Sequence, residues 1–275
     1  MPDGPPGLIA ATSAAAYLCG AAITHISTRA DRQPAGWHLL IVAGGWLLHA
    51  TVLWLQILAD TDNGISLGVA DALSVSAWIS AGLLMFLNLR QPIASLGLFL
   101  YPVAAFCVLL GAWLPQVSGP TLSTDWTVEL HVGLSLLAYG FLSLSALLAI
   151  ALGIQERGLR QHTPHGLTAA LPPLETTERL MFQWIGTGFA LLTLALLSGL
   201  FFVENWMAQH LAHKIILSLL AWLIFGGLLL GRRWRGWRGQ RSVRWTLSGY
   251  AVLLLAYFGS KFVLEALKNT HWYGS

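Results

Sequence analysis

Residues 127–155 have the sequence TVELHVGLSLLAYGFLSLSALLAIALGIQ, which is predominantly apolar. From Val132 to Ile154 no charged side chain interrupts it. A helix needs roughly 20 apolar residues to cross the hydrocarbon core of a bilayer, and a backbone in lipid must satisfy its own hydrogen bonds. The stretch therefore predicts a membrane-spanning α-helix.

Seven other apolar stretches of similar length accompany it. Hydrophobic residues make up 56% of the 275-residue chain and charged residues only 10%, whereas a soluble domain carries about 25% charged residues. Too little polar surface then remains to face water. We expect an all-α, polytopic helical bundle of about eight transmembrane helices, forming a single integral membrane domain over residues 1–275. The seven other predicted spans are 8–27, 36–58, 67–90, 93–114, 179–203, 213–231 and 244–267.

The basic residues predict the orientation of these spans. Cytoplasmic loops carry an excess of Lys and Arg. When alternate loops are taken as internal, every arginine falls on the internal face, and the external face holds only Lys214, Lys261 and Lys268. We therefore expect a multi-pass protein of a bacterial inner membrane, in contact with the lipid bilayer and with both termini external.

Several function classes lack support in the sequence. Cys19 and Cys107 lie in separate apolar segments, and the chain has no CxxC motif or Cys/His cluster. No nucleophile–base pair or phosphate-binding glycine loop is present, so we expect no enzyme. The basic residues sit beside membrane spans, which indicates topology rather than binding to nucleic acid. A transporter would require inverted repeats or broken helices, and none is clear.

Two histidines inside predicted spans are candidates for chemistry, because ionisable groups are costly there. His131 lies about one turn from the external end of its span, and His49 lies midway along the 36–58 span. Each has two interpretations. It forms a hydrogen bond to a neighbouring helix, or it is an axial ligand of haem iron, since neutral imidazole binds iron well. Sequence alone leaves both open.

Four segments together resemble the cytochrome c assembly membrane protein family, typified by CcsA and CcmC, and within it the YpjD/HemX-like inner-membrane subgroup. Their order and spacing along the chain make the resemblance fairly specific, and it covers most of the chain. The segments are NGISLGVADALSVSAW (63–78), LHVGLSLLAYGFLSLSALLA (130–149), LPPLETTERLMFQWIGTGFALLTLALLSG (171–199), and LLAWLIFGGLLLGRRWRGWRGQRS (219–242) followed by LLLAYFGSKFV (253–263).

The resemblance implies a haem-handling membrane protein without catalytic turnover. His131 matches the histidine of the family's LHV-type motif, which implies an external axial ligand of haem iron. His271 follows the last span, near the family's second external histidine, and is the candidate partner. Lys214 and Lys261 are candidate contacts of the haem propionates, although Lys261 has an alternative in a local ion pair with Glu265.

Two departures from the family pattern favour a different role. The haem-exporting members have a tryptophan-rich external segment where residues 202–218 have the sequence FVENWMAQHLAHKIILS, which keeps only Trp206 and Lys214 of that pattern. They also have a histidine where Arg232 stands, and arginine does not ligate iron. The second hypothesis is therefore an accessory or regulatory membrane subunit with a degenerate haem site, acting through partners such as haem-synthesis or ion-homeostasis proteins.

Overall fold

The computed structural model describes residues 5–30, 36–58, 69–90, 93–114, 126–160, 172–202 and 209–256. Within these ranges the regular structure is entirely helical, which confirms the all-α prediction for this part of the chain. A π-helical turn (Trp54–Leu58) extends the second helix, and a 3₁₀ turn (Ala94–Leu96) precedes the fourth. The α-helices are α1 (Pro5–Arg29), α2 (Trp37–Leu53), α3 (Val69–Asn88), α4 (Gly97–Trp113), α5 (Trp126–Arg160), α6 (Leu174–Phe202), α7 (Gln209–Arg235) and α8 (Gln240–Leu254).

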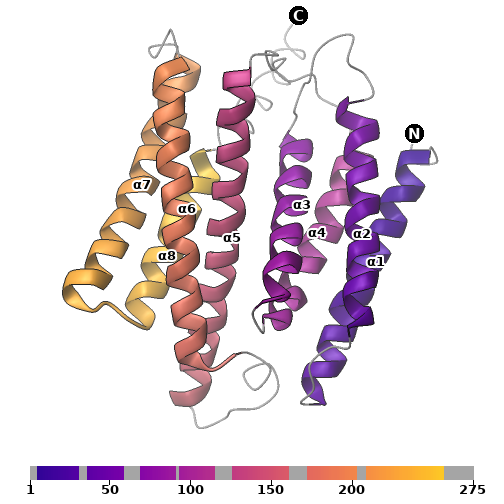
Figure 1. The fold of residues 1–275 in the computed structure, drawn as a ribbon, viewed down its shortest axis with the longest axis horizontal. Helices are drawn as coiled ribbons and strands as arrows, with labels where there is room; N and C mark the ends of the chain where they lie inside the picture. The colour runs from indigo at the N-terminus through magenta and orange to yellow at the C-terminus, as the bar shows by residue number, and fades with distance from the viewer. Residues whose placement is uncertain are drawn as a thin grey trace, which may run out of the picture.

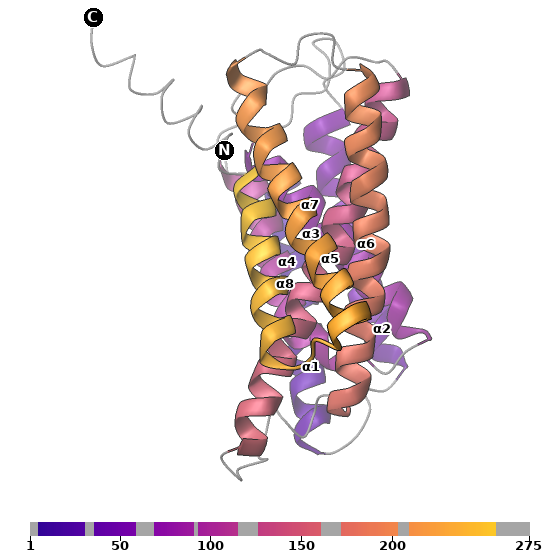
Figure 2. The same cartoon turned by 90° about the vertical axis from the view of Figure 1, so that its left-hand side faces the viewer.

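The helices form two groups that lie side by side (Figure 1). In the N-terminal half, α1 packs against α2 and α4, and α3 packs against α2 and α4. In the C-terminal half, α5 packs extensively along α6 and also contacts α8, while α7 packs against α6 and α8. Figure 2 shows α7 and α8 side by side, running roughly along the same direction as the other helices. The contact between α3 and α5 joins the two halves.

Small residues allow these helices to approach closely, as expected where lipid supplies no hydrophobic drive between helices. A Cβ atom on Gly45 of α2 would lie 2.9 Å from the Cβ atom of Ala16 on α1. At the joint between the halves, a Cβ atom on Gly140 of α5 would lie 2.6 Å from Leu83 Cδ1 on α3. Nearby, the hydroxyls of Ser80 and Ser143 are 2.9 Å apart and share a hydrogen bond. The joint therefore combines close packing with a polar contact.

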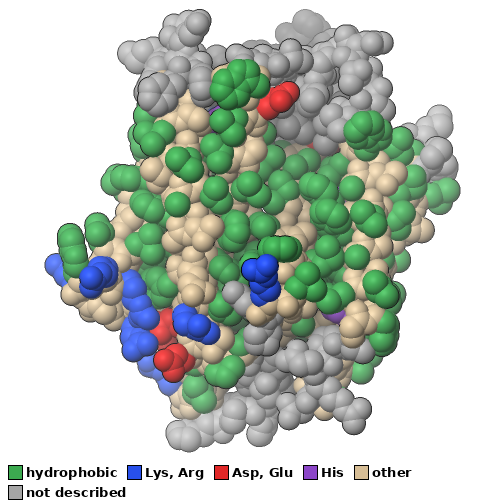
Figure 3. Space-filling model, viewed as in Figure 1, with side chains coloured by type: hydrophobic (Ala, Val, Ile, Leu, Met, Phe, Trp, Pro, Cys, Tyr) green, Lys and Arg blue, Asp and Glu red, His purple; other side chains and the backbone are tan. Residues whose placement is uncertain are grey.

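Seven of the helices are long and apolar enough to cross a membrane, and they include α1 to α7. Hydrophobic side chains form a broad band over the middle of the molecule, and Lys and Arg side chains gather below it on the face in view (Figure 3). The described part of α8 is 15 residues long and is not among these candidate spans. The structure thus supports a multi-pass helical membrane protein. The count of eight spans and the external termini stay predictions.

Several helices extend beyond the predicted apolar stretches, and α5 and α6 are two examples. Helix α5 continues to Arg160, and α6 begins at Leu174 rather than near residue 179. The apolar stretch ends where the chain leaves the lipid, whereas the helix ends where its backbone hydrogen bonds end. The two need not end at the same residue. The extra turns carry charged side chains and bring them together at one end of the C-terminal half. We call this the arginine-rich end; it comprises the ends of α5 and α7 and the beginnings of α6 and α8.

Candidate functional site

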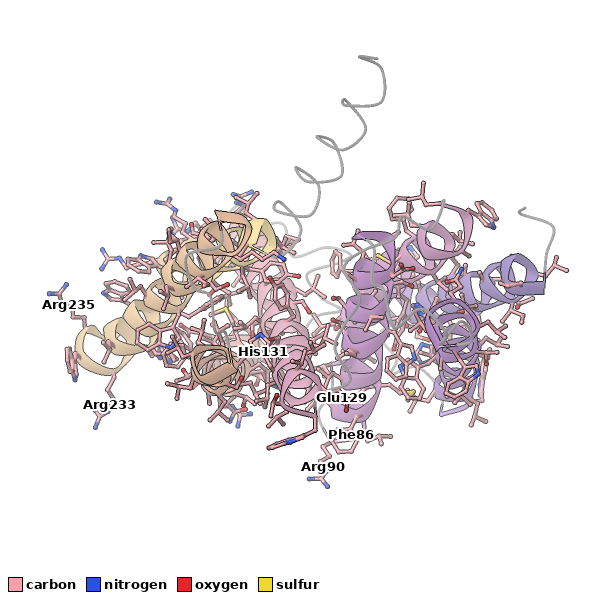
Figure 4. The ribbon with its side chains drawn as sticks, turned by 90° about the horizontal axis from the view of Figure 1, so that it is seen from above. Phe86, Arg90, Glu129, His131, Arg233 and Arg235 are labelled. Carbon is pink, nitrogen blue, oxygen red and sulfur yellow. The ribbon has the colours of Figure 1, made fainter. Side chains whose placement is uncertain are left out.

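His131 lies in the second turn of α5, at the end of the bundle opposite the arginine-rich end, and its side chain is half-buried. Its Nδ1 atom lies 2.9 Å from the carbonyl oxygen of Ala195 and 3.0 Å from the hydroxyl of Ser198, both on α6. Figure 4 shows this residue on α5, whereas Arg233 and Arg235 point away from the bundle at the end of α7. His131 is therefore anchored to a neighbouring helix, as one interpretation of the sequence predicts.

The same contacts determine the tautomer of the His131 ring. The Ala195 carbonyl oxygen can only accept a hydrogen bond, so Nδ1 must carry the proton in this contact. The Ser198 hydroxyl donates to the same carbonyl at 2.8 Å and can also accept from Nδ1. With the proton on Nδ1, Nε2 keeps its lone pair, and no described residue is bonded to it. A metal-binding histidine has this arrangement, in which the distal N–H is held by a carbonyl.

Gly199 of α6 lies directly against the imidazole ring of His131. A Cβ atom at this position would lie 3.1 Å from Cε1 of His131 and 3.5 Å from Nδ1. Any larger residue at 199 would push the ring away from its acceptors on α6. The hydrogen bonds and the close packing together hold the imidazole in one orientation.

His49 of α2 is in a different environment, in the core of the N-terminal half. Its side chain is fully buried. Its Nδ1 lies 3.4 Å from the hydroxyl of Tyr17 on α1, and its Nε2 lies 2.9 Å from the hydroxyl of Ser74 on α3. Both ring nitrogens thus have protein partners. These contacts favour the interpretation of His49 as a hydrogen-bonded core residue, and its role as a haem contact stays a prediction.

The three remaining predicted residues form no contact with His131 within the part of the chain that the structure describes. Lys214 lies in the second turn of α7, at the same end of the bundle, is half-buried, and forms no ion pair with the described residues. Lys261 and His271 lie outside the described residues. The structure therefore describes one anchored histidine and one free cation at this end of the C-terminal half, within the ranges it covers.

Comparison with known proteins assigns the family. The model of the cytochrome c assembly protein family matches residues 37–268, which include both histidines and all helices from α2 onward. The chain belongs to the cytochrome c assembly protein family. The resemblance inferred from the sequence is thereby confirmed.

Similar proteins include a named inner-membrane protein. The inner membrane protein YpjD of Escherichia coli (strain K12) is 32% identical over 245 residues, covering 86% of this chain and 90% of YpjD. A 28.8 kDa protein of Azospirillum brasilense is 33% identical over 256 residues, covering 92% of this chain and 86% of that protein. The cytochrome c biogenesis protein CcsA of Synechococcus sp. (strain RCC307) is 25% identical over 267 residues, covering 86% and 84%. No solved structure matches the chain significantly.

These comparisons and the apolar helices agree on location. This family member is a multi-pass protein of the bacterial inner membrane. The predicted localisation is therefore confirmed.

The sequence analysis missed a charged cluster at the arginine-rich end. Glu178 of α6 is buried and forms ion pairs with Arg232 Nη1 at 3.2 Å and Arg238 Nε at 3.3 Å. The guanidinium of Arg232 also lies over the ring of Phe182, 4.6 Å from its centroid, and donates to the carbonyl of Trp237 at 3.1 Å. A signal in the sequence was an acidic residue near the internal end of a predicted span, with arginines 54 and 60 positions later near the internal end of another.

Proposed function

We propose that this protein binds haem at the end of the bundle where α5 begins, with His131 Nε2 as an axial ligand of the iron. The observation that carries this proposal is the hydrogen bond from His131 Nδ1 to the carbonyl of Ala195. It leaves Nε2 as the nitrogen with a lone pair, which is the form of imidazole that binds iron. Bound haem would supply an iron centre for ligation and one-electron redox chemistry, and we propose no catalytic turnover.

The residues around His131 fit such a ligand. The imidazole is half-buried, so one edge remains open to an incoming group. Trp126 and Leu130, in the first turns of α5, expose 69% and 47% of their surfaces, and a porphyrin needs apolar or aromatic surface of this kind. Lys214 is a cation at the same end without an ion pair among the described residues, and it is suited to a propionate.

Family membership supports a role in cytochrome c biogenesis or haem homeostasis. CcsA of Synechococcus carries cytochrome c biogenesis in its name, and the similarity to it covers most of both chains. The partners that follow from this proposal are haem and proteins of cytochrome c assembly or haem synthesis. In this proposal, the partner proteins act on the haem that His131 binds at the membrane surface.

This placement requires a defined topology, which is also part of the proposal. The arginines at the ends of α5 and α7 are expected on the cytoplasmic side. An eighth span beginning near residue 244 would then return the chain to the other side, and both termini would be external. His131 would face the external side, as its match to the family's LHV-type histidine implies.

A second candidate function is supported by Arg232. The haem-exporting members that the sequence resembles have a histidine at this position, and here Arg232 is held by Glu178 at 3.2 Å. The internal end therefore has an ion pair, and no imidazole, at the position where those members have a histidine. An accessory or regulatory subunit with a degenerate haem site, acting through protein partners, fits this observation.

The visible spectrum of the purified protein tests haem binding and separates the two candidates. The protein in mild detergent is examined as isolated, after haem titration and after reduction with dithionite. We expect a Soret band that shifts on reduction, and its loss in His131→Ala. A protein that stays colourless through haem titration would reject the first function and favour the second.

Two variants make this test specific. In His131→Gly, added imidazole should restore the Soret band, because the free base can occupy the vacated position and ligate the iron. His25→Gln changes a half-buried histidine on α1, in the other half of the molecule, and should leave the spectrum unchanged. Equal loss of the band in both variants would mean that His131 is not the ligand.

A further inference from the structure

A second site lies at the arginine-rich end, away from His131. It is a cavity of about 610 Å³ lined by residues of α5, α6 and the turn between α7 and α8. Figure 3 shows acidic and basic side chains intermixed at this corner of the molecule. The charged residues that line the cavity are Glu156 and Arg160 on α5, Glu175 and Glu178 on α6, and Arg238 and Arg241 after α7.

Glu178 lines the cavity, but its carboxylate is already paired within the protein and is not available to a ligand. Its two carboxylate oxygens accept from Arg232, from Arg238 and from the backbone N–H of Gly239 at 3.3 Å. Gly239 has a positive φ of +60°, a backbone conformation that glycine adopts without strain. With two guanidinium partners, the charge of Glu178 is already neutralised within the protein.

Glu156 has no such compensation. Its Oε2 atom is buried and has no hydrogen-bond partner among the residues described. Its Oε1 atom lies against Gly239, where a Cβ atom would approach it to 2.3 Å. Leaving a buried carboxylate oxygen without a donor is costly. The Glu156 carboxylate therefore calls for a cationic N–H donor that the described side chains do not supply.

Two guanidinium groups of the cavity lack an anionic partner among the described residues. Arg160 and Arg241 are exposed and form no ion pair with any described carboxylate. The guanidinium of Arg241 lies over the ring of Trp237, 5.4 Å from its centroid, which limits its position. Guanidinium groups bind phosphate through paired N–H donors. The cavity thus presents groups for an anion beside a group for a cation.

We propose that this cavity binds a phosphoethanolamine group, with the phosphate on Arg160 and Arg241 and the ammonium on Glu156. A primary ammonium and a phosphate joined by two carbons match the unpaired carboxylate and the two unpaired guanidinium groups of the cavity in the sign of their charges. The site lies at the end of membrane-spanning helices, where lipid headgroups are found. The source of the group is either a phosphatidylethanolamine lipid or a soluble phosphoethanolamine compound. The proposal does not depend on haem binding.

Native mass spectrometry of the full-length protein in detergent tests the proposal. The protein is titrated with phosphatidylethanolamine, phosphatidylcholine and phosphatidylglycerol of identical acyl chains. The choline headgroup has no N–H donor, and the glycerol headgroup has hydroxyl donors but no cation, so neither gives Glu156 both a hydrogen bond and an opposite charge. We expect phosphatidylethanolamine to bind about tenfold more tightly than the other two, as one hydrogen bond to a charge warrants. Equal binding of the three lipids, with no effect of soluble phosphoethanolamine, would overturn the proposal.

Matched variants localise the effect. Glu156→Gln should remove the preference for phosphatidylethanolamine over phosphatidylcholine, while binding of phosphatidylglycerol is retained. Arg241→Gln should weaken all three lipids. Arg233→Gln, at the end of α7 and outside the cavity, should change nothing. The thermal midpoint of each variant shows whether it is folded, and a folded Glu156→Gln protein that keeps the preference would overturn the proposal.

Competition with soluble phosphoethanolamine separates the two sources. If it displaces the lipid only weakly, the membrane supplies the ligand. If it binds in the millimolar range or better, with the same loss in Glu156→Gln, the site takes a free compound of the same chemistry. Either result supports the assignment of the cavity.

Discussion

The two halves of the molecule place histidine in the membrane region in different ways. In the N-terminal half, His49 is fully buried and both ring nitrogens lie within hydrogen-bonding distance of protein hydroxyls. In the C-terminal half, His131 is half-buried, and only Nδ1 is bonded to described residues. Burial in the membrane region therefore does not by itself make a histidine a metal ligand. A ligand requires one nitrogen held and the other left available.

The arginine-rich end of the C-terminal half has charged contacts as well as neutral ones. Neutral hydrogen bonds connect the helices of the N-terminal half, such as the reciprocal indole N–H bonds of Trp46 and Trp78 to each other's carbonyl oxygens at 3.0 and 3.1 Å. The C-terminal half also has the Glu178 ion pairs at the arginine-rich end. Removing the partner of a buried charge lowers the free energy of unfolding more than removing the partner of a neutral group does. The stability of the protein should therefore be most sensitive to single substitutions at this end.

The largest effect is expected for Glu178→Gln. Removing one partner of a buried ion pair costs about 3–5 kcal/mol, and the partial exposure of both arginines brings our expectation to about 2–3 kcal/mol. Thermal unfolding in detergent, followed by tryptophan fluorescence, measures the loss. Glu175→Gln is the control, because Glu175 is exposed and lies one turn earlier on the same helix. Similar unfolding midpoints for the two variants would show that the cluster adds no stability.

A double comparison of the histidines comes next. His49→Ala leaves the hydroxyls of Tyr17 and Ser74 without their partner, at a cost of about 1–2 kcal/mol, but should leave any haem spectrum unchanged. His131→Ala should have the reverse effect, with loss of the Soret band and a smaller change in stability. The unfolding midpoint and the spectrum are recorded for both proteins. If His49→Ala also abolished the Soret band, the contrast between the halves would be wrong.

Particular residues show what the sequence could and could not predict. The apolar run from Val132 to Ile154 was enough to predict α5, because crossing lipid leaves a backbone little choice but a helix. His131 was found because a histidine near the end of such a run is unusual. The hydrogen bond that anchors the ring could not be predicted. Its acceptor is a backbone carbonyl 64 residues away, and the side chain at that position gives no sign of the contact. The partners of Glu178 were missed for a similar reason, because they lie 54 and 60 residues away, on α7 and in the turn that follows it.

The joint between the halves is tested by Gly140→Ala. A Cβ atom there would lie 2.6 Å from Leu83 Cδ1 and 3.1 Å from Ile79 Cγ2 on α3, so the leucine must move. Overpacking of this kind costs about 1 kcal/mol when a flexible side chain can yield. Gly133→Ala, on the same helix, is the control because nothing lies within 4 Å of its added methyl group. The control should be neutral or stabilised by up to about 1 kcal/mol. A larger loss in the control would place the sensitivity outside the joint.

The smallest effect is expected for Ser198→Ala, which removes one of the two acceptors of His131 Nδ1. Loss of a residue that orients a metal ligand usually lowers affinity about 10–100-fold. The Ala195 carbonyl remains here, so we expect haem affinity to fall by less than about tenfold, as measured by titration at the Soret band. Thr187→Ala is the control, since that exposed hydroxyl bonds only to the carbonyl of Gln183 in its own helix. Complete loss of binding in Ser198→Ala, with the control unaffected, would mean that the serine rather than the backbone orients the ring. The tautomer of His131 would then depend on a hydroxyl that can donate as well as accept, and the argument that Nε2 is held ready for iron would lose its basis.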